Sequence, residues 1–275
     1  MSVDLVAVMR YLNELATSRA YRSVNVARSM LSTTLGHVDG TNIGKHPLIV
    51  KLMKGLYNKK PPLAKYANLW YVNIILDFIS VMFSNEDLSF RVLSFKSAML
   101  LTLSLMLRVS DLANINLNSI YFPPIGVQFS FLKPRKSQRS GRLRTLRLRR
   151  LAVNLKICPV ACLETYILNS ISRRAELNER SLFISINSPN GNAKPSSIGR
   201  WLKQILEESG VNTDIFPAHS TRGAGASTAS TVGVPVDCIL ETAGWASEPA
   251  FKSFYHRLPD SDVSSTLLNG HNLLL

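Results

Sequence analysis

Acidic residues are scarce in this chain, and one long internal stretch has none. The 275 residues include 18 Asp and Glu against 32 Lys and Arg, which gives a formal net charge of +14. No acid lies between Asp111 and Glu164. A basic field of this size favours a polyanionic partner, so nucleic acid is the first hypothesis and an anionic membrane surface is the second.

Long hydrophobic runs are also lacking. The longest, AMLLTLSLML at 98–107, is far shorter than the ~20 apolar residues of a membrane span, so it predicts a buried helix. The opening segment MSVDLVAVMRYLNEL contains Asp4 and Glu14 and has no apolar block leading to a cleavage site, so no secretory signal is expected. We expect an intracellular protein, nuclear if its source is eukaryotic.

Cysteine is rare. Cys158, Cys162 and Cys238 are an odd number in a long chain, which argues against a disulfide framework and for reduced thiols. Cys158 and Cys162 lie one helical turn apart and could share a metal, but no second Cys/His pair follows at zinc-finger spacing. We predict that they are core thiols and that the protein holds no metal.

The first part of the chain has helical periodicity and ends in a linker. Helices are predicted over 3–17, 21–35 and 46–57. The segment YNKKPPLAKY then combines two prolines with three lysines, which is typical of a connection between domains. We expect a helical domain at 1–60 and a second domain at 61–275.

Beyond the linker one segment changes period. In GVQFSFL (126–132) apolar and polar residues alternate, which predicts a strand. RLRTLRLRR (142–150) predicts its antiparallel partner, with a bulge or bend where the alternation slips at Thr145–Leu146. The fold class is therefore mainly α with a small antiparallel β-sheet (α+β). Further helices are predicted over 66–83, 89–107, 159–172, 196–209, 218–231, 235–243 and 248–257.

The acid-free stretch concentrates the positive charge on the predicted hairpin. A solvated surface normally mixes both signs, so we interpret this one as facing DNA phosphates, which position a protein without reading sequence. A membrane surface ranks last, because it would need a basic amphipathic helix. The basic residues of the hairpin that we expect to contact DNA are Lys133, Arg135, Arg139, Arg142 and Arg144.

The segment AHSTRGAGASTAS (218–230) places His219 and Arg222 nearly one turn apart on one helix face, just after Pro217. A helix N-terminus favours an anion, so a phosphate is the expected ligand. The Gly, Ala, Ser and Thr residues that follow would let the helix pack closely against its neighbours. Taken alone, the pair is more typical of a capped helix start with a solvated arginine.

Arg108, Trp245 and Tyr255 indicate a function only when they are considered together. Arg108 ends an apolar helix and needs an anion or a route to water, with Asp111 as a local partner. Trp245 and Tyr255, ten positions apart, would each be interpreted singly as core residues of short amphipathic segments.

In order, the chain contains RVSDL, KPRKSQR, HSTR, GWAS and FKSFYHR. This series resembles the tyrosine recombinases of the phage-integrase superfamily over about residues 64–260. The residues of the last two motifs most resemble those in recombinases of eukaryotic mobile elements, such as DIRS-like retrotransposons and Cryptons. The resemblance implies a tyrosine-recombinase catalytic domain preceded by a helical, DNA-clamping core-binding domain.

The resemblance also implies roles. Arg108 and Arg222 would stabilise the charge that develops on the phosphate, and Tyr255 would attack it to form a 3′-phosphotyrosine link. His219 would bind the phosphate or assist proton transfer. Lys136 would protonate the leaving 5′-oxygen, with Lys133 as the alternative. Trp245 would donate its indole N–H to the phosphate, and Asp111 would orient Arg108.

Such chemistry needs neither metal nor ATP. The expected partner is double-stranded DNA, bound by a homo-oligomer of two or four chains, with the tail after Tyr255 as an interaction segment. Two alternatives stay open: an inactive, element-derived DNA-binding protein, and a type IB topoisomerase, which the motif wording and chain size favour less.

Overall fold

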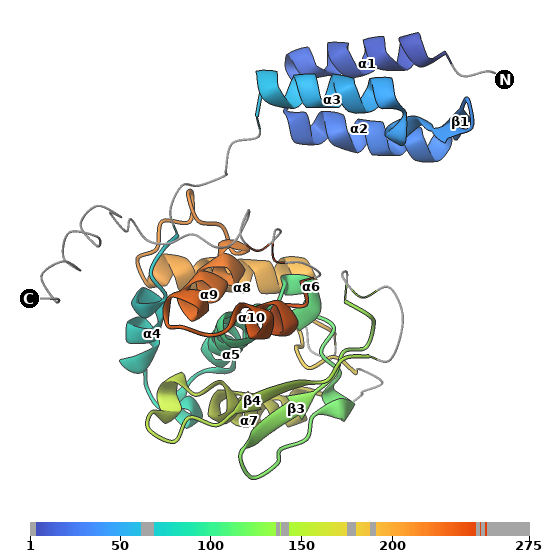
Figure 1. The fold of residues 1–275 in the computed structure, drawn as a ribbon. Coiled ribbons are helices and arrows are strands. Elements are labelled where there is room, and N and C mark those ends of the chain that lie inside the picture. Colours follow the sequence, from blue (N-terminus) through green and yellow to red (C-terminus); the bar gives the residue numbers. More distant parts are fainter. Residues whose placement is uncertain are drawn as a thin grey trace, which may run out of the picture. The chain divides into compact units, whose positions relative to one another are not determined.

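A computed structural model describes residues 4–61, 69–135, 138, 143–174, 180–187, 191–245, 248 and 251. The chain divides into two compact units, Met1–Lys65 and Tyr66–Leu275. The described residues form mostly helices with two small antiparallel sheets (Figure 1), which confirms the predicted α+β class. None of the described helices is both long and apolar enough to cross a bilayer.

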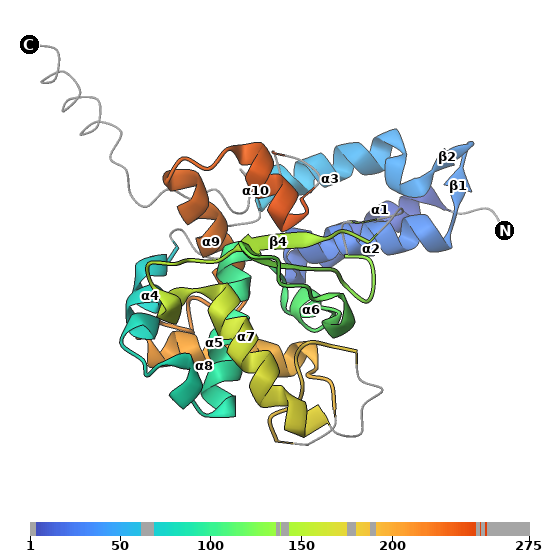
Figure 2. The same cartoon turned by 90° about the horizontal axis from the view of Figure 1, so that it is seen from below.

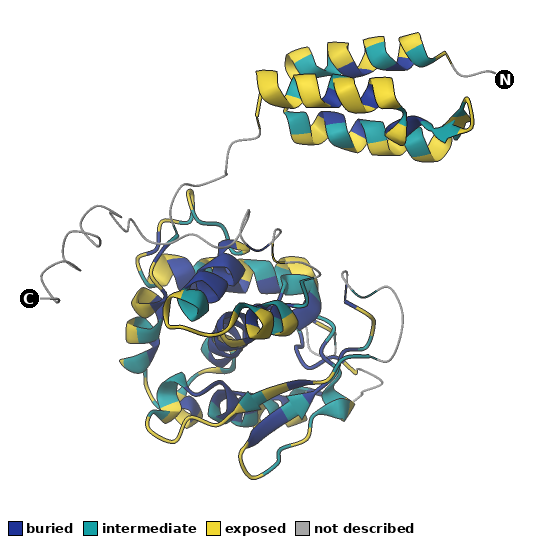
Figure 3. Ribbon diagram, in the orientation of Figure 1, coloured by how far each residue is buried: buried dark blue, intermediate teal, exposed yellow. Residues whose placement is uncertain are grey.

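The first unit is a bundle of three helices with a short hairpin. Its elements are α1 (Leu5–Ser18), α2 (Tyr21–Thr34), β1 (His37–Val38), β2 (Thr41–Asn42), η1 (Ile43–Lys45) and α3 (Pro47–Lys59). Asp4 caps α1 by accepting from the backbone amides of Val6 and Ala7 at 2.8 and 3.2 Å. Leu12, Val24 and Ile49 are fully buried, so each helix buries one face and exposes the other (Figure 3). The three predicted helices are confirmed to within three residues.

The hairpin in this unit was not predicted. Asp39 and Gly40 both have positive φ, 49° and 73°, and they join β1 to β2 by a two-residue turn. Asp-Gly is a strong signal for such a turn, but each flanking strand is only two residues long, so no alternation marks them.

The second unit is built around one buried helix. Its helices are α4 (Val72–Ser80), α5 (Phe90–Leu105), α6 (Val109–Leu112), α7 (Pro159–Ser170), α8 (Pro195–Glu208), α9 (Ser220–Thr231) and α10 (Val236–Ala243), with 3₁₀ turns η2 (Asn85–Asp87), η3 (Leu117–Ser119), η4 (Leu155–Ile157) and η5 (Ile171–Arg174). Helix α5 contacts α7, α8 and α9. Figure 3 shows α5 and most of α9 buried, as the apolar run at 98–107 predicts.

Helix α9 lies very close to α5, and its small residues explain why. A Cβ on Gly225 would meet the backbone oxygen of Leu103 at 2.7 Å, which is shorter than real Cβ contacts. A residue without a side chain is therefore required at this crossing. This confirms the close packing expected from the Gly- and Ala-rich segment. Figure 2 shows α9 and α10 side by side, and the two helices are in contact.

The basic hairpin forms, but without the expected bulge. Strand β3 (Gly126–Phe129) pairs antiparallel with β4 (Leu146–Arg149), with Phe129 opposite Leu146. The strand begins at Leu146, directly after Thr145, so the break in the alternation falls at the start of the ladder and not inside it. Helix α4 also differs from the predicted 66–83, because it starts at Val72 after residues without regular structure at 69–71. The predicted helix 248–257 lies outside the described residues, apart from Glu248 and Phe251.

Candidate functional site

Arg108 lies where α5 gives way to α6. Helix α5 ends at Leu105, and its C-cap, Met106, is a non-glycine residue with a left-handed backbone (φ 52°, ψ 41°). This conformation costs about 1–2 kcal/mol, and the buried Met106 side chain is held in a cluster that includes Ala226, Ile239 and Ala243. The chain then turns so that Arg108 becomes the N-cap of α6.

Asp111 is the carboxylate beneath Arg108. Its Oδ2 accepts from the Arg108 backbone N–H at 3.1 Å and lies 3.7 Å from Arg108 Nη1. Asp111 is only 4% exposed, whereas the Arg108 side chain is 28% exposed. Arg108 Nη1 is a buried atom and makes no hydrogen bond with the described residues. A half-buried guanidinium with an unsatisfied donor is suited to an anionic ligand.

Arg135 differs from the prediction. Its side chain is 2% exposed, and its Nη2 donates to Asp111 Oδ2 at 3.2 Å and to the carbonyl of Ala243 at 2.7 Å. Its Nη1 donates to the carbonyl of Thr242 at 3.1 Å, and the guanidinium lies 5.5 Å from the centre of the Phe131 ring. These protein groups occupy the guanidinium, so Arg135 does not lie on a DNA-facing surface as the charge pattern suggested.

Arg222 is buried in the first turn of α9. It is 4% exposed, and its Nη2 donates to the carbonyl of Ala243 at 2.8 Å. Its guanidinium carbon lies 4.5 Å from the centre of the Trp245 ring, as in a cation–π contact. His219 is the exposed N-cap of the same helix. His219 and Arg222 therefore lie at the same helix end, as expected, but His219 is exposed and Arg222 is buried.

The C-terminal end of α10 gathers several of these side chains. The last carbonyls of a helix lack intrahelical partners and carry partial negative charge, so they attract cations. Besides Arg135 and Arg222, Arg144 donates to the carbonyl of Glu241 at 2.8 Å and pairs with its carboxylate at 2.9 Å. Arginines from the hairpin and from α9 thus converge on one helix end.

Gly244 and Trp245 complete this end of α10. Gly244 has φ 67° and donates its N–H to the carbonyl of Glu241, while the Trp245 N–H donates to the carbonyl of Leu240. This hydrogen-bond pattern is a Schellman cap, which needs glycine at the left-handed position. The cap positions Trp245 so that its indole ring lies against the Arg222 guanidinium.

One chain of contacts therefore connects segments that lie far apart in the sequence. Asp111 contacts Arg108 and Arg135, Arg135 and Arg222 share the Ala243 carbonyl, and Arg222 lies against Trp245. Burial lowers the pKa of Arg135 from its ordinary value, and the carboxylate of Asp111 opposes that effect.

Other predicted residues are placed differently or not at all. Lys133 is exposed, and Arg144 is partly exposed in its pair with Glu241. Lys136, Arg139, Arg142 and Tyr255 lie outside the described residues, and so does the tail after Tyr255. On β4, Arg147 and Arg149 are exposed, whereas Leu146 is buried and Leu148 is half-buried, so the strand presents a basic outer face.

Trp70 was not identified from the sequence. It is 5% exposed, and its indole N–H donates to Ser220 Oγ at 2.9 Å. Ser220 is the first residue of α9, between His219 and Arg222. A lone tryptophan before a helix gives no sequence signal for this contact, because the two residues lie 150 positions apart.

Two of the three cysteines behave as core groups. Cys158 and Cys162 are free and buried, while Cys238 is free and exposed. The Cys158 sulfur accepts from the Leu151 N–H at 3.2 Å, and the Cys162 sulfur lies 3.2 Å from Ser97 Oγ. Within the described part of the chain no group of three His, Cys, Asp or Glu residues could hold a metal ion.

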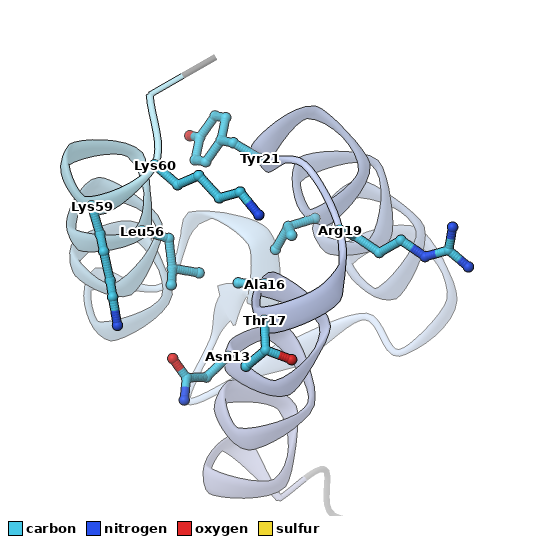
Figure 4. A pocket seen from close by; sticks show the side chains of 9 residues that line it. Asn13, Ala16, Thr17, Arg19, Tyr21, Leu56, Lys59 and Lys60 are labelled. Carbon is cyan, nitrogen blue, oxygen red and sulfur yellow. The ribbon is translucent and has the colours of Figure 1, made fainter. Parts of the chain in front are cut away.

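The first unit has a pocket of its own. It has a volume of about 390 Å³, with Ala16, Val24 and Leu56 as its apolar lining and basic residues at its rim. Figure 4 shows the Lys60 side chain reaching over the pocket near the Tyr21 ring, whereas Arg19 and Lys59 extend away from its centre.

No family model matches the sequence, and a search among curated proteins found no match. Solved structures are nevertheless similar in fold. The XerA recombinase superposes with a TM-score of 0.54 at 14% identity, over 97% of this chain and 90% of XerA. The Tn1549 transposon integrase in complex with circular intermediate DNA gives 0.60 at 12% identity, over 97% and 85% of the two chains. A lambda integrase dimer bound to a COC′ core site gives 0.53 at 13% identity, over 92% and 64%. The chain therefore has the fold of the tyrosine recombinases.

Proposed function

We propose that the protein breaks and rejoins DNA strands, as an integrase or site-specific recombinase does. The observation that carries the proposal is the contact chain from Arg108 through Asp111, Arg135 and the Ala243 carbonyl to Arg222. It links Arg108, the N-cap of α6, to Arg222 in α9, and this supports a shared phosphate site in a fold whose solved examples include DNA-bound integrases.

The proposed chemistry follows from the charges. Attack on a phosphodiester raises the negative charge on its non-bridging oxygens, and fixed guanidiniums stabilise that charge without a metal ion. Arg108 and Arg222 take this role, while the Trp245 indole N–H donates to the same phosphate. Asp111 orients Arg108 through its backbone and side-chain contacts.

The remaining steps rest on residues that the sequence motifs supply. A tyrosine hydroxyl has a pKa of about 10, so it needs in-line placement and loss of its proton. Tyr255 attacks the phosphorus, and the bond to the 5′-oxygen breaks as a 3′-phosphotyrosine forms. His219, exposed at the start of α9, assists proton transfer. Lys136 donates the proton to the leaving 5′-oxygen, with Lys133 as the alternative. Reversal by another 5′-hydroxyl rejoins the strand.

We also propose that both units contact DNA. Residues 1–60 clamp the duplex, with Arg19, Lys59 and Lys60 at the pocket rim as phosphate contacts, and the outer face of β4 adds Arg147 and Arg149. Homo-oligomer formation through the tail and the relation to DIRS-like and Crypton recombinases stay predictions.

The test is a trapped covalent adduct. Duplexes that bind the full chain are first selected from a random library, and each is then prepared with a nick beside the candidate cleavage position, so that the small leaving fragment diffuses away. Incubation in EDTA should yield a protein–DNA band stable to denaturant. Tyr255→Phe should abolish this band and leave salt-sensitive binding unchanged, while the matched Tyr121→Phe, at an exposed tyrosine, should keep both.

The outcomes separate the alternatives. Binding without an adduct would indicate a catalytically inactive DNA-binding protein. An adduct that relaxes supercoiled plasmid, with no exchange between two sites, would favour a topoisomerase-like enzyme. An adduct that requires a divalent metal, or that persists undiminished in Tyr255→Phe, would refute the proposal.

A further inference from the structure

Asp111 is a buried carboxylate placed between two arginines. Its Oδ2 accepts a hydrogen bond from Arg135 Nη2 at 3.2 Å and lies 3.7 Å from Arg108 Nη1. The shorter contact belongs to Arg135, which is the more buried of the two arginines. A buried carboxylate needs a close cationic partner to offset its burial, and Arg135 makes the shorter of the two side-chain contacts.

Arg135 also reaches the other half of the site. Its Nη2 donates to the Ala243 carbonyl at 2.7 Å, and the same oxygen accepts from Arg222 at 2.8 Å. Phe131 and the Thr242 carbonyl hold the guanidinium from two further directions. The Arg135 guanidinium therefore contacts both Asp111, which pairs with Arg108, and the Ala243 carbonyl, which accepts from Arg222.

We propose that Arg135 is a positioning residue that sets the charge and spacing of the phosphate site. By pairing with Asp111 it prevents that carboxylate from neutralising Arg108, and by holding the Ala243 carbonyl it fixes the hydrogen-bond partner of Arg222. This inference rests on the proposed function, because the phosphate is the ligand for which both arginines are arranged.

The charges give the reason. Without Arg135 the buried carboxylate of Asp111 faces Arg108 alone, and their Coulomb attraction is strong in a poorly solvated site. Arg108 Nη1 then moves closer to Asp111 Oδ2 than the present 3.7 Å. Its positive charge is neutralised by that carboxylate and stabilises the phosphate less. The Thr242 and Ala243 carbonyls also lose a donor, which loosens the end of α10 beneath Arg222.

The experiment compares single-turnover adduct formation at saturating nicked DNA in full-length variants. Arg135→Met, similar in length but uncharged, should slow adduct formation about 100-fold, the usual effect of losing one aligned charge-stabilising group. The dissociation constant for DNA should change by less than about threefold, since Arg135 is buried and contributes no phosphate contact. Arg135→Lys restores the charge beside Asp111 but not the planar fork, so it should recover part of the rate.

A double variant distinguishes positioning from simple structural support. In Arg135→Met with Asp111→Asn no unpaired carboxylate remains to capture Arg108, so the rate should rise about tenfold above that of Arg135→Met alone, which is a non-additive effect between residues in contact. If Arg135 only supports the fold, the second substitution should lower the rate and the melting temperature further. A rate for Arg135→Met within about threefold of the unaltered chain, or no recovery in the double variant, would overturn the inference.

Failure of the proposed function gives a different result. If the unaltered chain forms no adduct, the function is refuted, and the full chain is titrated with inorganic phosphate followed by ³¹P NMR. The inference predicts that Arg135→Met weakens phosphate binding about tenfold and that Asp111→Asn restores it. Equal affinity in all variants, or no phosphate binding by the unaltered chain, would overturn it. If Arg135→Met does not fold, the Arg135→Lys and double variants decide by the same criteria.

Discussion

Arg135 and Arg222 donate to the same carbonyl oxygen, that of Ala243, at 2.7 and 2.8 Å. Two guanidiniums would ordinarily repel each other, but the C-terminal end of α10 supplies the negative potential that holds them together. Arg144 adds a third guanidinium at the Glu241 carbonyl of the same helix end. A helix terminus thereby organises a concentration of positive charge, and the proposed function directs part of that charge at a phosphodiester.

Close contact between α5 and α9 predicts a sharp difference between two glycine substitutions. Gly225→Ala places a Cβ about 2.7 Å from the Leu103 oxygen, so we expect a loss of about 1–3 kcal/mol in the free energy of unfolding. Gly199→Ala, in α8, meets only a side-chain atom at 3.9 Å and should gain about 0.5–1 kcal/mol from helix propensity. Urea unfolding of both variants checks this, and equal effects would contradict the described crossing.

The Trp70–Ser220 hydrogen bond should couple the start of the second unit to the start of α9. Trp70→Phe and Ser220→Ala should each cost about 1 kcal/mol or more, since each removes one partner of a buried bond. The double variant should cost less than the sum, with a coupling of about 1 kcal/mol. Strictly additive free energies of unfolding would show that the bond contributes nothing.

Basic residues at the pocket rim of the first unit should contribute to the salt dependence of DNA binding. Lys60→Gln and Arg19→Gln should each lower the slope of log K against log salt by about 0.9 if each contacts one phosphate. Lys51→Gln, an exposed lysine of α3 that does not line the pocket, removes the same charge as a control. Fluorescence anisotropy over a salt series measures the slopes. Identical slopes for all three variants would show that the basic residues at the pocket rim do not contact DNA.

Cys162 predicts a pH dependence of stability. Burial raises the pKa of its thiol to about 11, from an ordinary value of 9.0. The folded state therefore keeps this proton to higher pH than the unfolded state, and the stabilisation is complete below pH 9 and lost as the pH rises through 11. The loss is about 2–3 kcal/mol.

Substitution of two cysteines tests this linkage. Cys162→Ala should flatten the decline of stability across that pH range, whereas Cys238→Ala, at an exposed thiol, should leave it unchanged. The comparison is made by urea unfolding at several pH values. Parallel declines in the two variants would contradict the assignment to Cys162.

Local patterns in the sequence predicted the elements but not the way their ends meet. The apolar run before Arg108 marked a buried helix, and the alternation on both sides of the basic loop marked a hairpin, because both signals are periodic within one segment. The burial of Arg135 could not be predicted in this way. Its partners come from α6 and α10, and composition alone assigned it with its exposed basic neighbours.

The site was predicted in part for the same reason. Spacing placed His219 and Arg222 at one helix start, but their exposure depends on packing with other segments: Arg222 is buried and bonded to the end of α10, whereas His219 is exposed. The Ala243 carbonyl accepts hydrogen bonds from two arginines, but it is a backbone group, so no residue type in the sequence identifies it. Backbone groups at helix ends enter such sites only once the helices are packed.

The most direct test of the account is the identity of the residue that becomes joined to DNA. The trapped adduct is digested with nuclease and trypsin, and the peptide SFYHR, residues 253–257, is sequenced by mass spectrometry. The account predicts a phosphodiester-linked nucleotide remnant on Tyr255, formed in EDTA. A remnant on any other residue, or cleaved DNA with no covalent link to the protein, would contradict it.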